Sequence, residues 1–279
     1  MSSSPCEHCG YDVPLSWERC PHCARPGLFP NVRAAAVPAE RAALEARYQA
    51  TLREAESRGA RQAVEAFETA ARGSKAVISR PFRELDRLSS SDKEVVSTFY
   101  QLIRGEVRLP HGNKWDGLRG LADEALFPGS REAIRFAALS LDGRGLPHYG
   151  DCTFVLQESM IAHRASVYEE NSAVAMKKHA YEPPPGHRAT WGERGKLCVA
   201  KLGGEVESTT TPVELPSLLL QSGATPDEDR FVEVHVWGPM TIRTIERAVV
   251  SAPRKGQRSA HSAIGARLKA VGVTWEVLP

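Results

Sequence analysis

Four cysteines near the N-terminus have the spacing of a metal site. Two C-x-x-C pairs are separated by ten residues, and their members are Cys6, Cys9, Cys20 and Cys23. Each pair lets two thiolates face one ion, and the returning chain completes a tetrahedron of sulfur ligands. This spacing predicts a zinc ribbon over residues 1–30 in which zinc is structural, and a redox dithiol is the weaker alternative.

A carboxylate and an imidazole alternate with valines in the segment FVEVHVWG, residues 231–238. Such strict alternation predicts a strand whose valines lie in the core and whose other face carries Glu233 and His235. An acid among apolar neighbours requires a compensating interaction or a function, because a buried unpaired charge is costly. Glu233 is therefore the first catalytic candidate, and His235 lies beside it, where it can orient an acceptor or act as a base.

A second group of polar residues accompanies two further segments with the pattern of strands. The apolar runs 134–141 and 152–156 are bounded by glycines, as strands often are. Polar side chains held on rigid strands are the usual construction of a ligand site. The candidates in and around these segments are Arg135, His148, Tyr149, Gly150 and Ser166.

Each of these residues also has a structural interpretation. Arg135 can form an ion pair with a neighbouring acid, Tyr149 can belong to the core, and Ser166 can be an ordinary strand residue. The functional interpretation therefore depends on the residues acting together at one site.

The segment before these strands has the composition of helices. Ala, Glu, Arg and Leu dominate residues 38–72, which predicts a helix or a helical hairpin bent near Gly59. Residues 91–94 match the capping box S-x-x-E and predict a second helix that ends near Gly105. We therefore expect residues 31–108 to be a helical arm that mounts the zinc ribbon on the rest of the protein.

The last part of the chain alternates between strand and helix. Residues 247–252 and 273–278 have strand patterns, and residues 259–271 between them have a helical pattern. Together with the earlier strands they predict a mixed β-sheet domain over residues 109–279. The expected fold class is α+β, with a small zinc ribbon, a helical arm and a mixed-sheet catalytic domain.

The composition and the N-terminal sequence argue against a membrane-bound protein, a secreted protein and a protein that binds nucleic acid through a high net charge. The 279 residues include 42% hydrophobic residues, enough for a core, and carry a formal net charge of +2. This charge gives no strong attraction to nucleic acid or to a membrane surface. The N-terminus lacks a signal-peptide pattern, and four of the six cysteines have metal-ligand spacing, which suits a reducing compartment. We therefore expect a cytoplasmic protein without a membrane partner.

The order of the candidate residues resembles that of the ADP-ribosyltransferase superfamily, in particular its divergent branches among bacterial toxins and phage-defence effectors. Matching segments are IRFAALS, LPHYGDCTFVL, HRASVYEENS and FVEVHVWGP, which lie within residues 111–250. They carry an arginine on an early strand, a serine on a following strand and a glutamate on a late strand. The late strand reads Glu-Val-His where the family has Glu-x-Glu, and Ala-Ser-Val replaces its Ser-Thr-Ser.

The resemblance implies an NAD-dependent mono-ADP-ribosyltransferase that modifies a protein or a nucleic acid and has an antitoxin or another partner protein. NAD would be the substrate, and zinc would remain a structural ion. Glu233 would stabilise positive charge at the ribose, Arg135 would bind the pyrophosphate or the ribose, and Tyr149 would stack on nicotinamide. The remaining members of the implied catalytic and NAD-binding sites are His148, Gly150, Ser166 and His235.

Two other functions are compatible with the residues alone. A metal-dependent nuclease or hydrolase requires four side chains to converge on one ion, namely His148, Asp151, Glu233 and His235. A non-catalytic zinc-ribbon interaction protein predicts a filled cavity between Glu233 and Tyr149. The transferase requires instead that Glu233 and Arg135 reach one solvent-accessible cavity sized for a dinucleotide.

Overall fold

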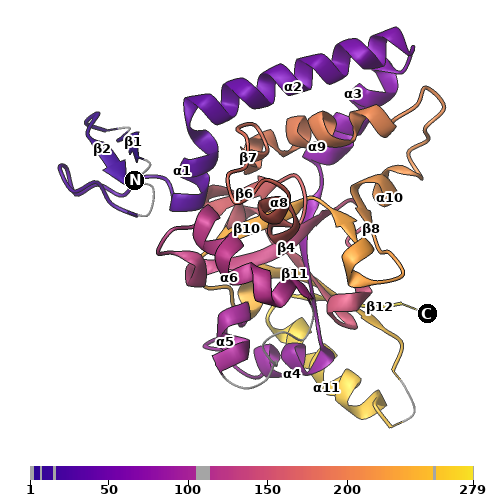
Figure 1. Cartoon of the computed structure of the whole chain (residues 1–279). Coiled ribbons are helices and arrows are strands. Elements are labelled where there is room, and N and C mark those ends of the chain that lie inside the picture. Colours follow the sequence, from indigo (N-terminus) through magenta and orange to yellow (C-terminus); the bar gives the residue numbers. More distant parts are fainter. Residues whose placement is uncertain (1–2, 7, 15–16, 105–113, 254–255, 279) are drawn as a thin grey trace.

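A large mixed sheet forms the centre of the molecule, and helices pack around it (Figure 1). The computed structural model describes the chain except for residues 1–2, 7, 15–16, 105–113, 254–255 and 279. The sheet has eight strands in the order β12-β11-β5-β3-β4-β10-β6-β7. The pair of β11 and β12 is parallel, and the other pairs are antiparallel. This mixture of helices with one large sheet agrees with the predicted class.

The strands of the large sheet are β3 (Lys75–Arg80), β4 (Ile134–Ser140), β5 (Cys152–Leu156), β6 (Ala165–Tyr168), β7 (Arg188–Thr190), β10 (Glu233–Trp237), β11 (Ile245–Ser251) and β12 (Thr274–Leu278). Two small sheets pair β1 (Ser3–Pro5) with β2 (Asp12–Pro14) and β8 (Leu220–Gln221) with β9 (Arg230–Phe231). The main helices are α1 (Pro30–Ala36), α2 (Pro38–Ser57), α3 (Arg61–Arg72), α4 (Phe82–Ser90), α5 (Phe99–Arg104), α6 (Lys114–Leu126), α8 (Ser172–Lys178), α9 (Arg194–Leu202) and α11 (Arg258–Ala270). Two shorter helices are α7 (Glu158–Ile161) and α10 (Leu215–Leu219).

The central strand β10 is buried on both faces. Its valines belong to the largest hydrophobic core, as the alternation in the sequence predicts. The opposite face packs Trp237 into a smaller cluster with residues of α6 and α8. A strand covered on both sides must satisfy most of its polar side chains internally, because little of it is exposed to water.

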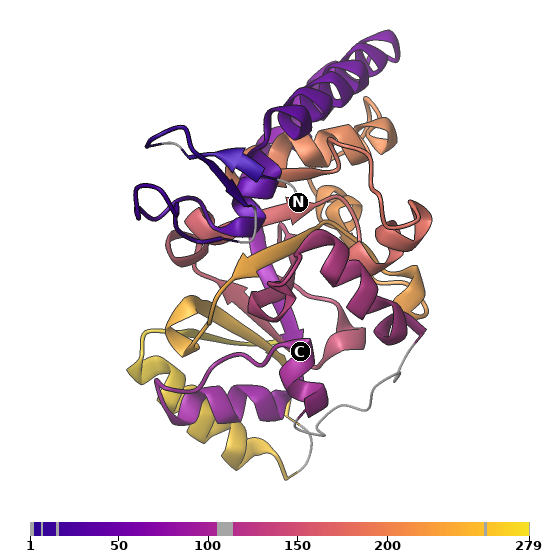
Figure 2. The ribbon, with the colours of Figure 1, turned by 60° about the vertical axis from the view of Figure 1, so that its left-hand side comes forward.

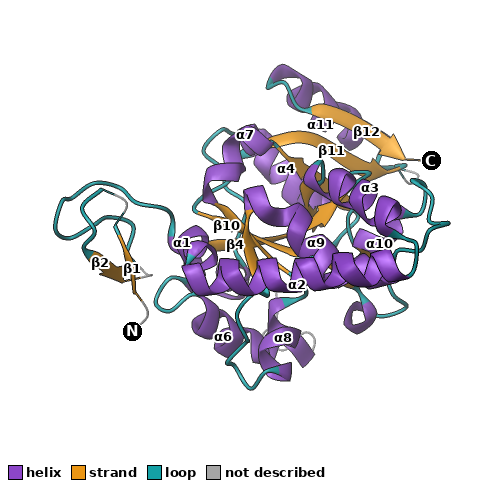
Figure 3. Ribbon diagram, turned by 90° about the horizontal axis from the view of Figure 1, so that it is seen from above, coloured by secondary structure: helices purple, strands orange, loops and turns teal. Residues whose placement is uncertain are grey.

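The predicted helical hairpin is confirmed. Helices α2 and α3 are joined by a bend in which Gly59 has a φ of +66°, a conformation that glycine adopts without a steric penalty. Both helices pack against α9, and Figure 3 shows α2 crossing above the sheet. Helices α4 and α11 pack together at the other end of the molecule (Figure 2).

The predicted helix start at residues 91–94 is wrong. The Ser91 hydroxyl and carbonyl accept hydrogen bonds from the amides of Lys93 and Glu94, which makes a turn that follows α4. Val95 then pairs with Thr241 in an isolated bridge, so this stretch is extended and α5 begins only at Phe99. Pairing with a distant loop therefore replaces the helix that the local motif favours.

The expected helical arm contains a strand that the sequence analysis missed. Strand β3 lies between α3 and α4 in the chain, yet it occupies the middle of the sheet between β4 and β5. The segment 31–108 therefore contributes to the main core as well as carrying the N-terminal ribbon. The expected boundary at residues 108–109 lies outside the described residues.

Strands β3 and β4 pair over only part of their length. Lys75 to Val77 pair with Ser140 to Ala138, and β3 then continues beside β5 as far as Arg80. The first four residues of β4 therefore have β10 as a neighbour on one side and no pairing with β3 on the other. This fork in the sheet creates the space in which the candidate site lies.

Gly150 is required where the loop before β5 passes the end of β3. Its φ is +150°, and a Cβ atom placed there would lie 2.1 Å from the carbonyl carbon of Arg80.

We expect Gly150→Ala to lower the free energy of unfolding by about 1–3 kcal/mol, since the backbone must shift or remain strained. Urea denaturation measures the change. Gly192→Ala is the control, since a Cβ at Gly192 meets no atom within 4 Å; equal stabilities of the two variants would contradict the argument.

Candidate functional site

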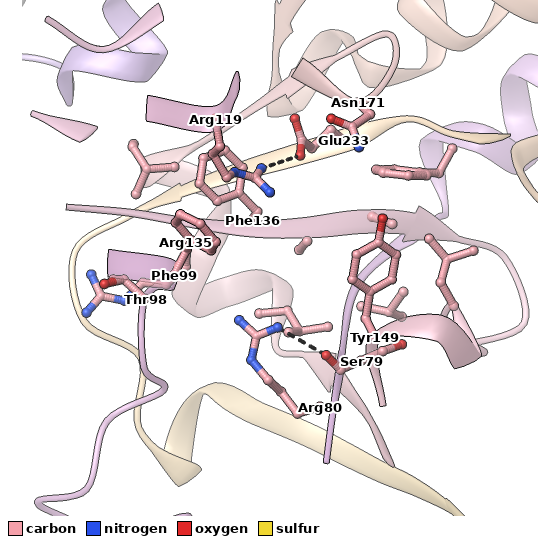
Figure 4. A pocket seen from close by; sticks show the side chains of 17 residues that line it. Ser79, Arg80, Thr98, Phe99, Arg119, Arg135, Phe136, Tyr149, Asn171 and Glu233 are labelled. Carbon is pink, nitrogen blue, oxygen red and sulfur yellow. Dashed lines mark hydrogen bonds and ion pairs between the residues drawn. The ribbon is translucent and has the colours of Figure 1, made fainter. Parts of the chain in front are cut away.

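A cavity of about 110 Å³ lies at the fork between β3 and β4 (Figure 4). Its charged lining consists of three arginines and one glutamate, which are Arg80, Arg119, Arg135 and Glu233. Its aromatic lining consists of Phe99, Phe136, Tyr149 and Phe231. Pockets that enclose a whole ligand commonly measure about 300–1,000 Å³. The cavity can therefore enclose one end of a dinucleotide but not the complete molecule, so the expectation of a cavity sized for a dinucleotide is wrong.

The Glu233 carboxylate is buried, and both of its oxygens accept hydrogen bonds. Its Oε1 accepts a hydrogen bond from Arg119 Nη2 at 3.1 Å, and its Oε2 accepts one from the Ser172 backbone amide at 2.8 Å. His235 Nε2 lies 3.1 Å from the same Oε2. Because a carboxylate only accepts, this contact assigns the proton to Nε2 of His235. The three donors come from α6, the first residue of α8 and β10 itself.

These contacts keep Glu233 ionised. Burial alone would raise its pKa, but the hydrogen bond and charge of His235, the charge of Arg119 and the Ser172 amide lower the pKa below its ordinary 4.5. The neighbouring acid Asp123 behaves differently, because burial raises its pKa even though Arg119 Nε lies 3.5 Å from its Oδ2. Arg119 therefore lies between two acids whose pKa values are shifted in opposite directions.

Arg119 is a site residue that the sequence analysis missed. Its guanidinium stacks over the Phe136 ring, with its carbon 3.9 Å from the ring centroid. It also forms the ion pair with Asp123 four residues later on α6. The four-residue spacing of Arg119 and Asp123 is the signal in the sequence, but the same spacing is common on exposed helices.

Arg135 lines the same cavity as Glu233 but projects from the opposite face of the sheet. In the pairing of β4 with β10, Arg135 lies opposite Val236, and Glu233 lies opposite Ala138. Side chains that face each other across a strand pair share a face, and successive side chains alternate. The carboxylate and Arg135 therefore approach the cavity from its two sides, and the guanidinium that contacts Glu233 is that of Arg119.

Arg135 itself is weakly satisfied. It is buried, and its Nη1 donates to the carbonyl of Ala133 at 3.1 Å. Among the described residues, its Nε has no hydrogen-bond acceptor. Burial, together with the charge of Arg164, lowers its pKa. A buried cation with an unused donor suits an anion in the cavity.

His235 and Ser166 lie next to the cavity rather than in its lining. They face each other across β10 and β6, and the His235 ring packs against Phe127 and Phe136. The side-chain amide of Asn31, on α1, donates to Ser166 Oγ at 3.2 Å and to the His235 carbonyl at 2.9 Å. The expected catalytic serine is therefore part of a buried polar connection between α1 and the two strands.

The three neighbouring candidates His148, Tyr149 and Gly150 have different roles. Tyr149 lines the cavity, as the stacking hypothesis requires. His148 lies apart from the cavity lining, with its Nδ1 3.0 Å from the Asp229 carboxylate. Gly150 permits the close approach to β3 described above.

The four side chains expected of a metal-dependent nuclease do not converge. Asp151 accepts a hydrogen bond from the Phe82 amide, and His148 contacts Asp229, while Glu233 and His235 contact each other. In the part of the chain that the structure describes, the cysteine cluster is the single group of three or more side chains able to hold a metal ion. The cavity between Glu233 and Tyr149 is also open, unlike the filled one that an inert interaction protein predicts.

The four cysteines of the N-terminal ribbon form a cluster that fits zinc. Their sulfur atoms all lie within 4.8 Å of one another, and Cys6–Cys23 and Cys9–Cys20 are separated by 3.7 and 3.6 Å. A tetrahedral zinc ion with bonds of about 2.3 Å separates its sulfur ligands by about 3.8 Å. The His8 amide donates to Cys6 Sγ and lowers the pKa of Cys6, which favours the thiolate that metals bind.

The ribbon is attached to the strand that carries Glu233. Trp237, at the end of β10, donates from Nε1 to the Glu18 carboxylate at 3.1 Å. Arg33 on α1 donates to the carbonyls of Pro14 and Leu28. The ribbon is therefore held against the body by side-chain hydrogen bonds from both α1 and β10.

We expect Cys9→Ser to reduce bound zinc well below one ion per chain, because a serine hydroxyl does not replace a thiolate ligand at neutral pH. Metal analysis of the purified protein measures the content. Cys198→Ser is the control, since Cys198 is buried outside the cluster. Equal zinc contents of the two variants would contradict the metal site.

The ionised state of Glu233 can be tested through the pH dependence of stability. A lowered folded-state pKa contributes stability above the ordinary value of 4.5, and that contribution is lost as the pH falls through the folded-state pKa. We expect the difference in unfolding free energy between the wild type and Glu233→Gln to shrink below pH 4.5. Denaturant titrations at several pH values measure it. A difference that stays constant to about pH 3 would disagree with the assigned charge.

No helix in the described part of the chain has the length and apolar character needed to cross a membrane. The chain matches no protein-family model, and no curated protein sequence matches it significantly. Any assignment of function therefore depends on the geometry of the cavity and of the cysteine cluster.

Proposed function

We propose that the protein is an NAD-dependent mono-ADP-ribosyltransferase whose active site is the cavity at the fork of the sheet. The observation that carries this proposal is a buried, ionised carboxylate at the wall of an aromatic cavity whose other charged residues are arginines. An inert core does not need such an arrangement, because burying the charges of Arg135 and Glu233 is costly unless they interact with a ligand or with other charges. The order of the key residues in the sequence points to the same chemistry.

The charge of the cavity suits the substrate. The lining contains three guanidinium groups and one carboxylate, so its net formal charge is +2. The pyrophosphate of NAD carries two negative charges, which this net charge would balance. Tyr149 and Phe136 offer aromatic surfaces to a planar base. The enclosed volume fits the nicotinamide ribose, and the rest of the dinucleotide extends towards the mouth of the cavity.

In the proposed reaction the C–N bond between nicotinamide and ribose breaks, and its electron pair leaves with neutral nicotinamide. The ribose carbon develops positive charge, as in glycoside hydrolysis. The negative charge of Glu233 stabilises that state, and Arg119 and His235 hold the carboxylate in place. A nucleophilic oxygen or nitrogen of the target then bonds to this carbon and loses its proton to solvent.

We infer that the target is a protein or a nucleic acid and that the zinc ribbon contributes to its selection. The ribbon presents Tyr11 and Trp17, which are about half exposed. It is attached to β10, so a target bound there lies near the strand that carries Glu233. A partner that inhibits a toxin of this kind would bind the same surface. The cysteine cluster suits the reducing cytoplasm, where thiolates remain available to zinc.

We expect Glu233→Gln to lower the rate of nicotinamide release from NAD at least about 100-fold, because an amide cannot stabilise the developing charge. The assay incubates the purified protein with NAD, with and without cell extract, and measures free nicotinamide.

The matched control is Glu40→Gln. Glu40 is also buried, and it accepts hydrogen bonds from one guanidinium, that of Arg188, and one backbone amide, that of Gly186. It lies outside the cavity lining, so its variant should keep the wild-type rate. Equal losses in both variants would indicate a general effect on folding. An unchanged rate in Glu233→Gln, or a wild type that releases no nicotinamide, would refute the proposed function.

A further inference from the structure

Asn171 lines the cavity and has no role in the site described so far. It is half-buried and directly precedes α8. The next residue, Ser172, gives its backbone amide to the Glu233 carboxylate. Asn171 is therefore held next to the proposed catalytic acid by the chain itself.

The side-chain amide of Asn171 has a fixed orientation. Its Oδ1 accepts a hydrogen bond from the Ala173 backbone amide at 3.0 Å, which makes Asn171 the N-cap of α8. With the oxygen engaged in this way, the amide nitrogen is directed away from the helix. No acceptor among the described residues receives a hydrogen bond from this nitrogen. In Figure 4 the amide lies beside Glu233, and the Tyr149 hydroxyl points towards the pair.

We propose that Asn171 binds the substrate, with Nδ2 donating a hydrogen bond to a hydroxyl oxygen of the nicotinamide ribose. This inference rests on the proposed function and specifies how the sugar is recognised. A ribose hydroxyl both donates and accepts, so a site that binds it well supplies one acceptor and one donor. Glu233 is the acceptor, since a carboxylate cannot donate. Asn171 supplies the neutral donor on the same wall of the cavity.

A neutral donor has an advantage over a further cation at this position. Arg119 and His235 already contact the carboxylate, and an additional cation there would offset more of the negative charge that stabilises the reacting carbon. An amide donor positions the sugar without changing the charge of the site. The capping bond orients this donor before the substrate arrives, which lowers the entropy lost on binding.

The test uses substitutions that keep the helix cap and remove the donor. Serine, aspartate and asparagine are similarly good N-cap residues, so Asn171→Ser and Asn171→Asp should melt at nearly the wild-type temperature. Serine is neutral and too short to place a donor where the amide nitrogen lies. We expect both variants to raise the KM for NAD about tenfold, the value of one lost hydrogen bond, with a smaller change in kcat.

Two measurements separate the outcomes. Nicotinamide release gives KM and kcat, and calorimetric titration with NAD gives the affinity directly. Asn171→Ala is a further control, because it removes both the donor and the cap and should lower the melting temperature as well. A wild-type KM in Asn171→Ser overturns the inference, even when Asn171→Asp is impaired, since the added charge then explains that loss. A wild type that neither binds nor cleaves NAD overturns both this inference and the proposed function.

Discussion

The negative charge buried on Glu233 is the constraint on which the rest of the site depends. A carboxylate in the interior of a sheet is stable only when several donors are aimed at it. Arg119 of α6, the first amide of α8 and His235 of β10 meet this requirement together. Displacing any one of these elements would leave the charge with fewer donors. The hydrogen bonds to this charge and the apolar packing against Trp237 together hold α6 and α8 on the sheet.

A second buried polar connection extends this arrangement to the N-terminus. Asn31 on α1 bonds to the serine of β6 and to the backbone of β10, so α1 fixes the two strands beside Glu233. Glu18 of the ribbon bonds to Trp237 at the end of the same strand. The cysteine cluster thus belongs to a continuous structure that ends at the cavity. A rearrangement of the cysteine cluster would therefore act on α1 and on the end of β10.

The parts of this structure that local sequence determines could be predicted. The side-chain alternation identifies β10, and the cysteine spacing identifies the cluster, because both patterns are properties of a few consecutive residues. Strand β3 was missed because it is a short segment between two helices, and its assignment depends on pairing with β4 and β5. The contact of Arg119 with Glu233 joins residues 114 positions apart, so only tertiary packing creates it. Arg135 was correctly placed on a strand, but the strand register that turns it away from Glu233 is not encoded locally.

The fork between β3 and β4 also affects how the cavity can recognise a molecule. Along the first four residues of β4, one edge of the strand lacks the ladder partner that a complete sheet would provide. Among the described residues no strand pairs with that edge, so its main-chain amides and carbonyls can hydrogen-bond a ligand in the way that an added strand uses an exposed edge. Affinity built on peptide groups is insensitive to the identity of the side chains. Such main-chain hydrogen bonds would add to the contacts of the Arg135 and Phe136 side chains, and they would be lost if the two strands paired along their whole length.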